Sequence, residues 1–152
     1  MNVRSAQPSD VAGMLEMLRL SAEEQGFPES LVADEQNLLE DGFGSQPRFS
    51  CMLAEVDGAI AGMALYFFIY STWISRKNLY LEDLFVRPEY RGRGVGRTLM
   101  SHLITLAQNE GCRRMVWMVH DANERAIRFY ESLGAVALRD WIVMVVKERT
   151  SG

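Results

Sequence analysis

The sequence has little of what marks several large classes of protein. Its 152 residues include two cysteines, Cys51 and Cys112, and two histidines. No paired Cys/His spacing is present, so we predict no metal site and two reduced thiols rather than a disulfide framework. Basic charge is not in excess, because the formal net charge is −4. An acidic balance of this kind argues against a nucleic-acid partner.

Long apolar runs are also scarce. The first ten residues contain none, so we expect no signal peptide. Residues 59–75 carry no charge, but they fall short of the roughly 20 residues of a membrane helix and are rich in aromatic and β-branched types. A buried strand is expected there instead. We therefore expect a cytoplasmic protein with no membrane partner.

The composition is that of an ordinary globular domain, with 48% hydrophobic and 24% charged residues, and we predict one domain over residues 1–152. Hydrophobic periodicity orders the elements as β-α-α-β-β-β-α-β-α-β-β, a mixed sheet with helices on its faces. The expected strands are residues 2–6, 49–56, 59–70, 78–86, 114–119, 135–138 and 141–147. Four helices are expected: one that begins at residues 8–10, and three that cover residues 29–44, 95–111 and 121–134.

Two local signals sharpen this order. Asp57-Gly58 between two apolar runs predicts a two-residue hairpin turn. Asp121 and Glu124 have the spacing of a capping box at a helix start, and Gly134 follows that helix.

A loop rich in glycine and arginine separates strand 78–86 from the next helix. A strand, a glycine-rich turn and a helix form an arrangement that binds phosphate, because free N–H groups of the first helical turn point at the anion. The glycine spacing fits neither a dinucleotide fingerprint nor a P-loop. A solvated arginine cluster is the alternative reading. The residues concerned are Arg87, Arg91, Gly92, Arg93, Gly94, Gly96 and Arg97.

Two adjacent carboxylates, Glu82 and Asp83, interrupt the apolar strand 78–86. Side chains alternate across a strand, so we expect them on opposite faces of the sheet. Ionised carboxylates in a buried strand are costly unless they are paired, which makes both candidates for function. The alternative is a pair of carboxylates satisfied by core or interface partners.

Residues 91–96 match R-x-x-G-x-G and so resemble the acetyl-CoA pyrophosphate motif of the GNAT superfamily of N-acetyltransferases. The likeness extends over nearly the whole chain, since residues 127–135 resemble the family's closing helix and residues 56–64 its central hairpin. Within the superfamily the chain most resembles the diamine (spermidine/spermine) and thialysine acetyltransferases. This closer resemblance rests on residues 38–44 and 80–86 and on Trp73 and Trp141.

The resemblance implies an α+β fold with a mixed, mostly antiparallel sheet, acetyl-CoA as the acetyl donor, and a homodimer. It implies that the end of strand 78–86 pairs with the pantetheine arm like an added strand. The residues implied in coenzyme binding are the backbone of Leu84, Phe85 and Val86, the loop Arg91, Gly92, Arg93, Gly94, Val95, Gly96 and Arg97, and also Asn123 and Tyr130.

Amine acetylation explains why such residues are needed. A primary amine of pKa about 10 must lose a proton before it attacks a thioester, and the leaving thiolate gains from a proton donor. By resemblance, Glu82 assists the deprotonation and Tyr130 is the general acid. Pattern alone leaves amphipathic packing open for Tyr130, and a helix cap for Asn123.

The substrate is less well indicated. By resemblance the amine site includes Glu82, Asp83, Trp73, Glu24, Trp141 and Arg139. Ser71 and Arg139 stand where diamine enzymes commonly carry acidic residues. Fewer carboxylates are therefore expected to bind the far ammonium group of a polyamine. We therefore expect an amine that bears its own carboxylate, such as lysine or thialysine, held by Arg139 or another arginine. Peptide N-acetylation and a non-catalytic acetyl-CoA-binding module are the alternatives.

Overall fold

A computed structural model describes residues 1–147. The chain divides into two compact units, Met1–Met118 and Val119–Gly152, and each is described by itself. One domain over residues 1–152 stays a prediction. The strands of the first unit are β1 (Asn2–Ser5), β2 (Ser50–Val56), β3 (Ala59–Ser71), β4 (Arg76–Val86) and β5 (Met115–Val116). Its helices are α1 (Val11–Gln25), α2 (Glu35–Phe43) and α3 (Val95–Asn109), with 3-10 turns at Pro8–Asp10, Pro28–Ser30 and Pro88–Tyr90. The second unit contains α4 (Glu124–Glu131).

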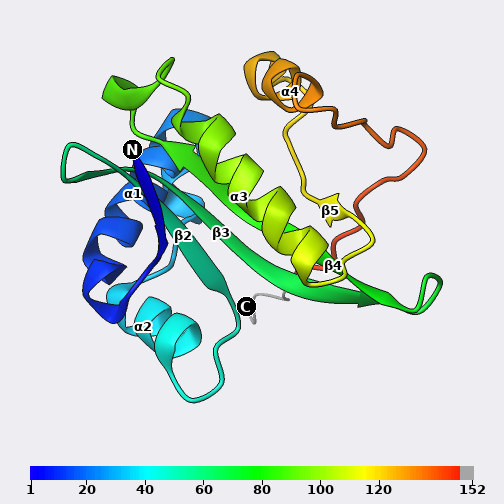
Figure 1. The fold of residues 1–152 in the computed structure, drawn as a ribbon, viewed down its shortest axis with the longest axis horizontal. Coiled ribbons are helices and arrows are strands. Elements are labelled where there is room, and N and C mark those ends of the chain that lie inside the picture. Colours follow the sequence, from blue (N-terminus) through cyan, green and yellow to red (C-terminus); the bar gives the residue numbers. More distant parts are fainter. Residues whose placement is uncertain (148–152) are drawn as a thin grey trace. The chain divides into compact units, whose positions relative to one another are not determined.

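The strands form one sheet in the order β1-β2-β3-β4-β5. The first three pairings are antiparallel, and only β4 with β5 is parallel. Within the first unit, α3 covers one face of this sheet, while α1 and α2 lie on the other (Figure 1). The expected mixed, mostly antiparallel sheet flanked by helices is confirmed.

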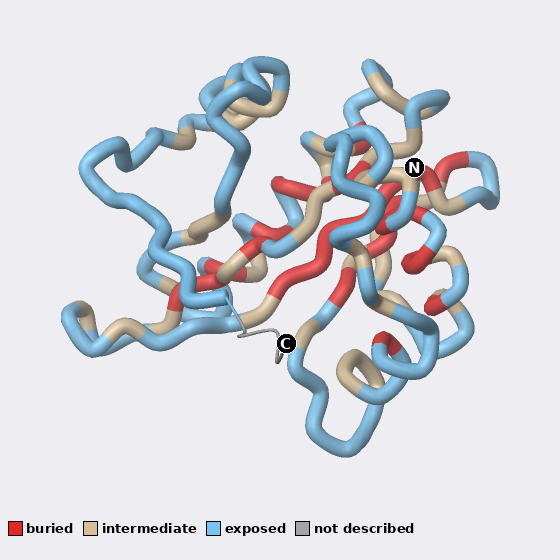
Figure 2. Tube along the Cα trace, turned by 180° about the vertical axis from the view of Figure 1, so that it is seen from behind, coloured by how far each residue is buried: buried red, intermediate tan, exposed pale blue. Residues whose placement is uncertain are grey.

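The core lies between the sheet and the inner faces of its helices (Figure 2). The inner face of α1 is buried, with Met14 and Leu15 at 2% exposure or less. Helical spacing of apolar residues in α3 predicts an inner face that includes Leu99, Leu103 and Ile104, but Ile104 is exposed and Met100 is buried in its place. None of the helices among residues 1–147 is both long and apolar enough to cross a bilayer.

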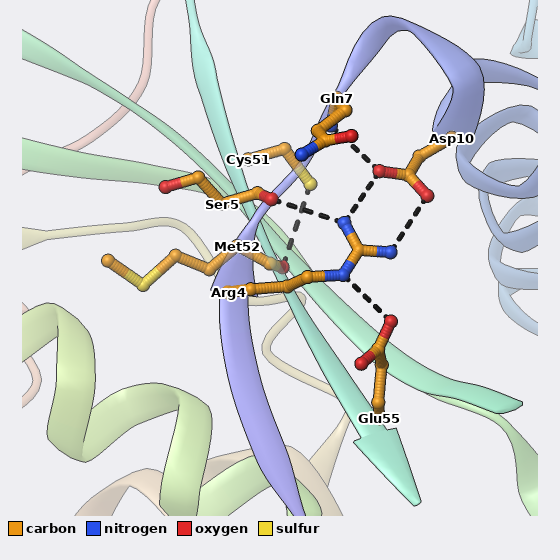
Figure 3. Close-up of polar contacts among 7 residues, drawn as sticks. All are labelled: Arg4, Ser5, Gln7, Asp10, Cys51, Met52 and Glu55. Carbon is orange, nitrogen blue, oxygen red and sulfur yellow. Dashed lines mark hydrogen bonds and ion pairs between the residues drawn. The ribbon is translucent and has the colours of Figure 1, made fainter. Parts of the chain in front are cut away.

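Arg4 joins the first strand to two other parts of the chain (Figure 3). Its Nε donates to Glu55 of β2 at 2.7 Å, and its terminal nitrogens donate to both Asp10 oxygens at 2.7 and 2.9 Å. The Gln7 backbone N–H also donates to Asp10. Arg4 holds the pKa of the Asp10 carboxyl below its usual value. The network fixes the start of α1 against the sheet edge.

The Asp57-Gly58 turn joins β2 to β3 as predicted. Both residues have positive φ, 52° and 82°, as the twist-matched two-residue hairpin requires. The helix expected over residues 29–44 is shorter, because Asp34 begins it: its side chain accepts a hydrogen bond from the Asn37 N–H at 2.8 Å.

Two strand predictions near the end of the chain are wrong. Within the described residues, neither 135–138 nor 141–147 forms a strand, and strand 114–119 shrinks to Met115–Val116. Their apolar, β-branched composition favours extended backbone, but a strand also needs a hydrogen-bonded neighbour. The side chains from Trp141 to Val146 are 65 to 100% exposed.

The capping box predicted from Asp121 and Glu124 is also wrong. The helix N-cap is Asn123, whose Oδ1 accepts a hydrogen bond from the Ala126 N–H at 3.1 Å. A side chain directly before the helix reaches its free amides better than one two residues earlier.

Gly62 is expected to be intolerant of alanine. A Cβ there would lie 2.8 Å from the Phe85 carbonyl oxygen and 3.1 Å from Val95 Cγ1, so β4 or the start of α3 would have to move. We expect Gly62→Ala to cost about 1 to 3 kcal/mol of unfolding free energy, measured by chemical denaturation. In the matched variant Gly13→Ala, the new Cβ meets only Ile60 Cδ1 at 3.6 Å, and helix propensity predicts a gain of about 0.5 to 1 kcal/mol. Equal effects of the two variants would contradict this packing.

Candidate functional site

The glycine–arginine loop lies between the end of β4 and the start of α3. Gly92 and Gly94 have φ of 73° and 80°, a left-handed conformation that favours glycine. A Cβ at either position would meet no atom within 4 Å. The glycines are therefore needed for backbone conformation, and they leave open space beside the loop.

The N-terminus of α3 is suited to an anion. Gly94 is its N-cap, and no side chain of the described residues caps it. The Thr98 N–H makes the first helical bond, to the Gly94 carbonyl at 2.9 Å. The amides of Val95 and Gly96 precede that bond, in the turn whose N–H groups have no acceptor within a helix. The first-turn amides, the helix dipole and the open space beside the glycines fit a phosphate group.

Two loop arginines bind carboxylates of α1. Arg87 donates to both Glu16 oxygens, at 2.7 and 3.3 Å, and Arg91 to both Glu24 oxygens, at 2.5 and 2.7 Å. Arg91 also donates to the Val86 carbonyl at 2.9 Å. Both side chains thus hold the loop against α1. A phosphate role for Arg91 and a substrate role for Glu24 stay predictions, and each would require this pair to open or share its hydrogen bonds.

The other two loop arginines are placed differently. The Arg93 guanidinium is about half exposed, lies 3.7 Å from the Asp57 carboxylate and sits 5.3 Å from the centre of the Tyr90 ring. Arg97 lies in the first turn of α3. The ion pair of Arg93 is therefore looser than those of Arg87 and Arg91.

The end of β4 has one strand neighbour within residues 1–147. Leu84, Phe85 and Val86 pair with β3, whereas β5 pairs only with Leu79 and Tyr80. The edge of β4 beyond Tyr80 is thus not covered by β5. An extended group adding to that edge fits the predicted backbone role of these three residues.

A β-bulge in β4 carries both carboxylates. Asp83 pairs with Leu65 and Leu81 with Tyr66, so Glu82 is the extra residue. The predicted opposite orientation of Glu82 and Asp83 is wrong, because a bulge interrupts the alternation of side chains. Asp83 lies on the Leu65 face by pairing, and Glu82 lines a pocket with Leu65.

That pocket lies on the α1–α2 side of the sheet. Its volume is about 350 Å³, and its lining is Arg48, Phe49, Leu65, Phe67 and Glu82. Phe67 is held by stacking on Tyr80, with ring centroids 5.1 Å apart. The pocket is mainly aromatic and aliphatic, with one carboxylate and one guanidinium. It can hold an amine beside Glu82.

Burial raises the pKa of Asp83 to about 6, and the neighbouring Glu82 carboxylate adds to the shift. The folded carboxyl binds its proton more tightly than the unfolded one, whose pKa is near 3.8. Its ionisation therefore lowers stability, by an amount that grows between about pH 4 and pH 6 and is complete above that range.

Asp83→Asn is therefore expected to raise the melting temperature by a few degrees near pH 7.5 and to lose most of this gain near pH 4. Calorimetry at both pH values measures the difference. Asp121, whose side chain is 99% exposed, provides the control Asp121→Asn, for which no such change is expected. A gain of equal size at both pH values would refute the assignment to Asp83 ionisation.

The second unit contains Tyr130 and Asn123. Tyr130 lies near the end of α4, half-buried, and burial raises the pKa of its phenol. A neutral phenol at physiological pH retains the proton that a general acid must donate. Asn123 is the helix cap described above, which agrees with the alternative reading of that residue. Its pantetheine contact stays a prediction.

Trp73, Trp141 and Arg139, also predicted to bind substrate, are not among the residues that line the pocket. Trp73 is at the β3–β4 turn and 95% exposed, and Trp141 in the second unit is 79% exposed. Arg139 is also exposed in that unit. Their substrate roles stay predictions.

Sequence reasoning did not identify Arg48 and Phe49 as pocket residues. They lie in a loop, and the sequence of a loop does not indicate which strand its side chains will contact. It also did not predict the bulge. Two consecutive carboxylates, Glu82 and Asp83, in an otherwise apolar strand are the signal that could have indicated it.

Comparison with known proteins gives consistent results. A sequence profile of the Acetyltransferase (GNAT) family matches residues 13–135. A thialysine N-epsilon-acetyltransferase of Sus scrofa is 38% identical over 141 residues, 88% of this chain and 82% of that protein. A spermidine/spermine N(1)-acetyltransferase-like protein 1 of Homo sapiens is 32% identical over 143 residues, 90% of this chain and 20% of that protein.

Solved structures share the fold. An integron cassette protein from the mobile metagenome of V. cholerae has a TM-score of 0.80 at 25% identity, covering 97% of this chain and 92% of that one. An aminoglycoside acetyltransferase from an uncultured soil metagenomic sample, solved with sisomicin, has a TM-score of 0.81 at 15% identity, with 97% and 96% covered. At that identity the second likeness concerns the fold alone.

Proposed function

Because this chain belongs to the GNAT acetyltransferase family, we propose that it transfers an acetyl group directly from acetyl-CoA to a primary amine of a small molecule. The family implies acetyl-CoA as the donor. When bound, acetyl-CoA supplies the thioester that the amine attacks. The proposal is supported by one observation: β4 carries the carboxylate pair, Glu82 and Asp83, and the glycine–arginine loop connects its end to the N-terminus of α3, which is suited to an anion.

The loop and the strand end divide the binding of the donor between them. The amides of Val95 and Gly96 hold phosphate oxygens, and Arg93 adds a charge-assisted hydrogen bond. The uncovered edge at Leu84 to Val86 orients the extended arm, and an N–H of this edge stabilises the oxyanion.

Glu82 first binds the cationic amine and then helps remove its proton through water. The amine is almost wholly protonated at neutral pH, so a nearby carboxylate is needed both for binding and for proton transfer. Asp83, half-buried beside it, increases the local negative charge. Tyr130 donates a proton to the leaving sulfur.

The substrate class follows from the relatives and from the charges of this chain. The matched proteins of Sus scrofa and Homo sapiens are named for thialysine and for spermidine or spermine. Here Ser71 and Arg139 stand where a polyamine would favour acids. We therefore assign the chain to lysine- or thialysine-like amines ahead of polyamines.

We further propose that the protein is a cytoplasmic homodimer, as the family resemblance implies. The exposed apolar side chains from Trp141 to Val146 are compatible with a subunit contact. Light scattering is expected to give twice the mass of the chain. A monomer at working concentration would remove this part of the proposal.

Release of thiol from acetyl-CoA against a panel of amines tests the function. The panel contains thialysine, lysine, spermidine, spermine, putrescine, a peptide with a free N-terminus, and no amine. Rapid release with thialysine or lysine is expected. If the kcat/KM for spermidine were about tenfold above the values for both amino acids, the substrate assignment would be overturned. If no small amine caused thiol release, the proposed function would be overturned.

A further inference from the structure

The pocket beside Glu82 contains charges of both signs. Glu82 comes from β4, and Arg48 comes from the segment between α2 and β2. Phe49, Leu65 and Phe67 supply the rest of the lining. The pocket therefore presents an anionic group and a cationic group on an apolar surface.

Arg48 is positioned by α2. Its Nε donates to the Asp41 Oδ1 at 2.8 Å, and its backbone N–H donates to the Asp41 carbonyl at 2.6 Å. The two side chains are 79% and 46% exposed, so this ion pair adds little stability. It does orient the guanidinium, whose terminal nitrogens are further donors with the geometry that a carboxylate accepts.

The apolar lining suits the stem of a ligand rather than a third charge. Phe67 is fixed by stacking on Tyr80, and Leu65 is 5% exposed. Methylene or thioether groups gain free energy on such surfaces by leaving water. A second ammonium without a carboxylate beside it, as in a diamine, would by contrast approach Arg48 with no compensating charge and be repelled.

We propose that this pocket selects ω-amino acids, with the amine at Glu82 and the carboxylate at Arg48, so that Arg48 is a specificity-determining residue. The inference rests on the proposed function and refines its substrate class. It replaces Arg139 of the second unit with Arg48 of the first as the partner of the carboxylate.

The test uses two amines that differ by one group. Lysine and cadaverine have the same amine and methylene chain, but cadaverine lacks the carboxylate. For Arg48→Gln we expect the lysine kcat/KM to fall about tenfold, mainly through KM, because a charge-assisted hydrogen bond is lost. The cadaverine value is expected to rise, because a repulsive cation has been removed. Arg48→Lys should restore part of the lysine activity.

Arg19→Gln is the control, because it removes the same charge from the exposed surface of α1 and should change the kinetics of neither substrate. Arg139→Gln tests the competing assignment: if Arg139 holds the carboxylate, this variant and not Arg48→Gln should lose lysine activity selectively. Thermal unfolding of each variant establishes that it is folded.

Three results would overturn the inference while the proposed function stands: equal effects of Arg48→Gln on the two amines, no effect on lysine, or a charge-dependent loss in Arg139→Gln instead. Absence of acetylation of any amine by the wild-type protein would overturn the proposed function, and this inference with it.

Discussion

Replacing Tyr130 with phenylalanine is expected to lower kcat by about 100-fold or more, while the Kd for acetyl-CoA stays within about twofold. The substitution keeps the ring in α4 and removes only the hydroxyl that donates a proton to the leaving thiolate. Burial raises the pKa of the Tyr130 phenol, so the wild-type residue keeps its proton at neutral pH. Steady-state kinetics with thialysine and calorimetric titration with acetyl-CoA measure the two quantities.

Tyr70 provides the matched control, because it is a 67% exposed tyrosine of β3 with no assigned role. Tyr70→Phe should leave both values unchanged. If Tyr130→Phe retained full kcat, Tyr130 would be a packing residue and another group would have to protonate the sulfur. If the wild-type protein bound acetyl-CoA without turnover, the alternative of a binding module would gain support.

Replacing Gly94 with aspartate is expected to weaken acetyl-CoA binding by about 100-fold or more. Gly94 has a φ of 80° and is the N-cap of α3. An aspartate there brings a negative charge to the amides assigned to the phosphates, and its carboxylate competes for the same N–H groups. Calorimetric titration with acetyl-CoA measures the loss.

The backbone cost of a side chain at positive φ must be separated from this effect. Gly111 has a φ of 67°, and a Cβ there would also meet no atom within 4 Å, but it follows the other end of α3. Gly111→Asp therefore bears a similar conformational cost, about 1 to 2 kcal/mol, without touching the loop. Unchanged acetyl-CoA affinity in Gly94→Asp would contradict the assignment of the loop.

Local signals predicted the parts of the fold that short segments determine. The Asp57-Gly58 turn needs positive φ at both residues, and few residue types adopt it, so the dipeptide alone indicated the hairpin. The glycines before α3 were equally informative, because their spacing and their position after a strand indicate a tight turn that leads into a helix. Both features depend on neighbours along the chain.

The errors arose where the outcome depends on distant parts of the chain. Residues 141–147 have the composition of a strand but pair with no other strand in the part of the chain that the structure describes. The ion pair of Arg91 with Glu24, distant in sequence, was not predicted either, and the phosphate role assigned to Arg91 from its motif stays a prediction. A charge pattern cannot distinguish an ion pair within the protein from a contact with a ligand. The bulge at Glu82 depends likewise on the register between β3 and β4.

Transfer of a radiolabelled acetyl group tests the central claim most directly. The protein is mixed with labelled acetyl-CoA and thialysine, and both the free thiol and the N-acetylated amine are quantified over time. The account predicts that the two appear in equal amounts, and that neither forms at a comparable rate without the amine. Thiol release without labelled amine, or bound acetyl-CoA with no transfer to any small amine, would contradict it.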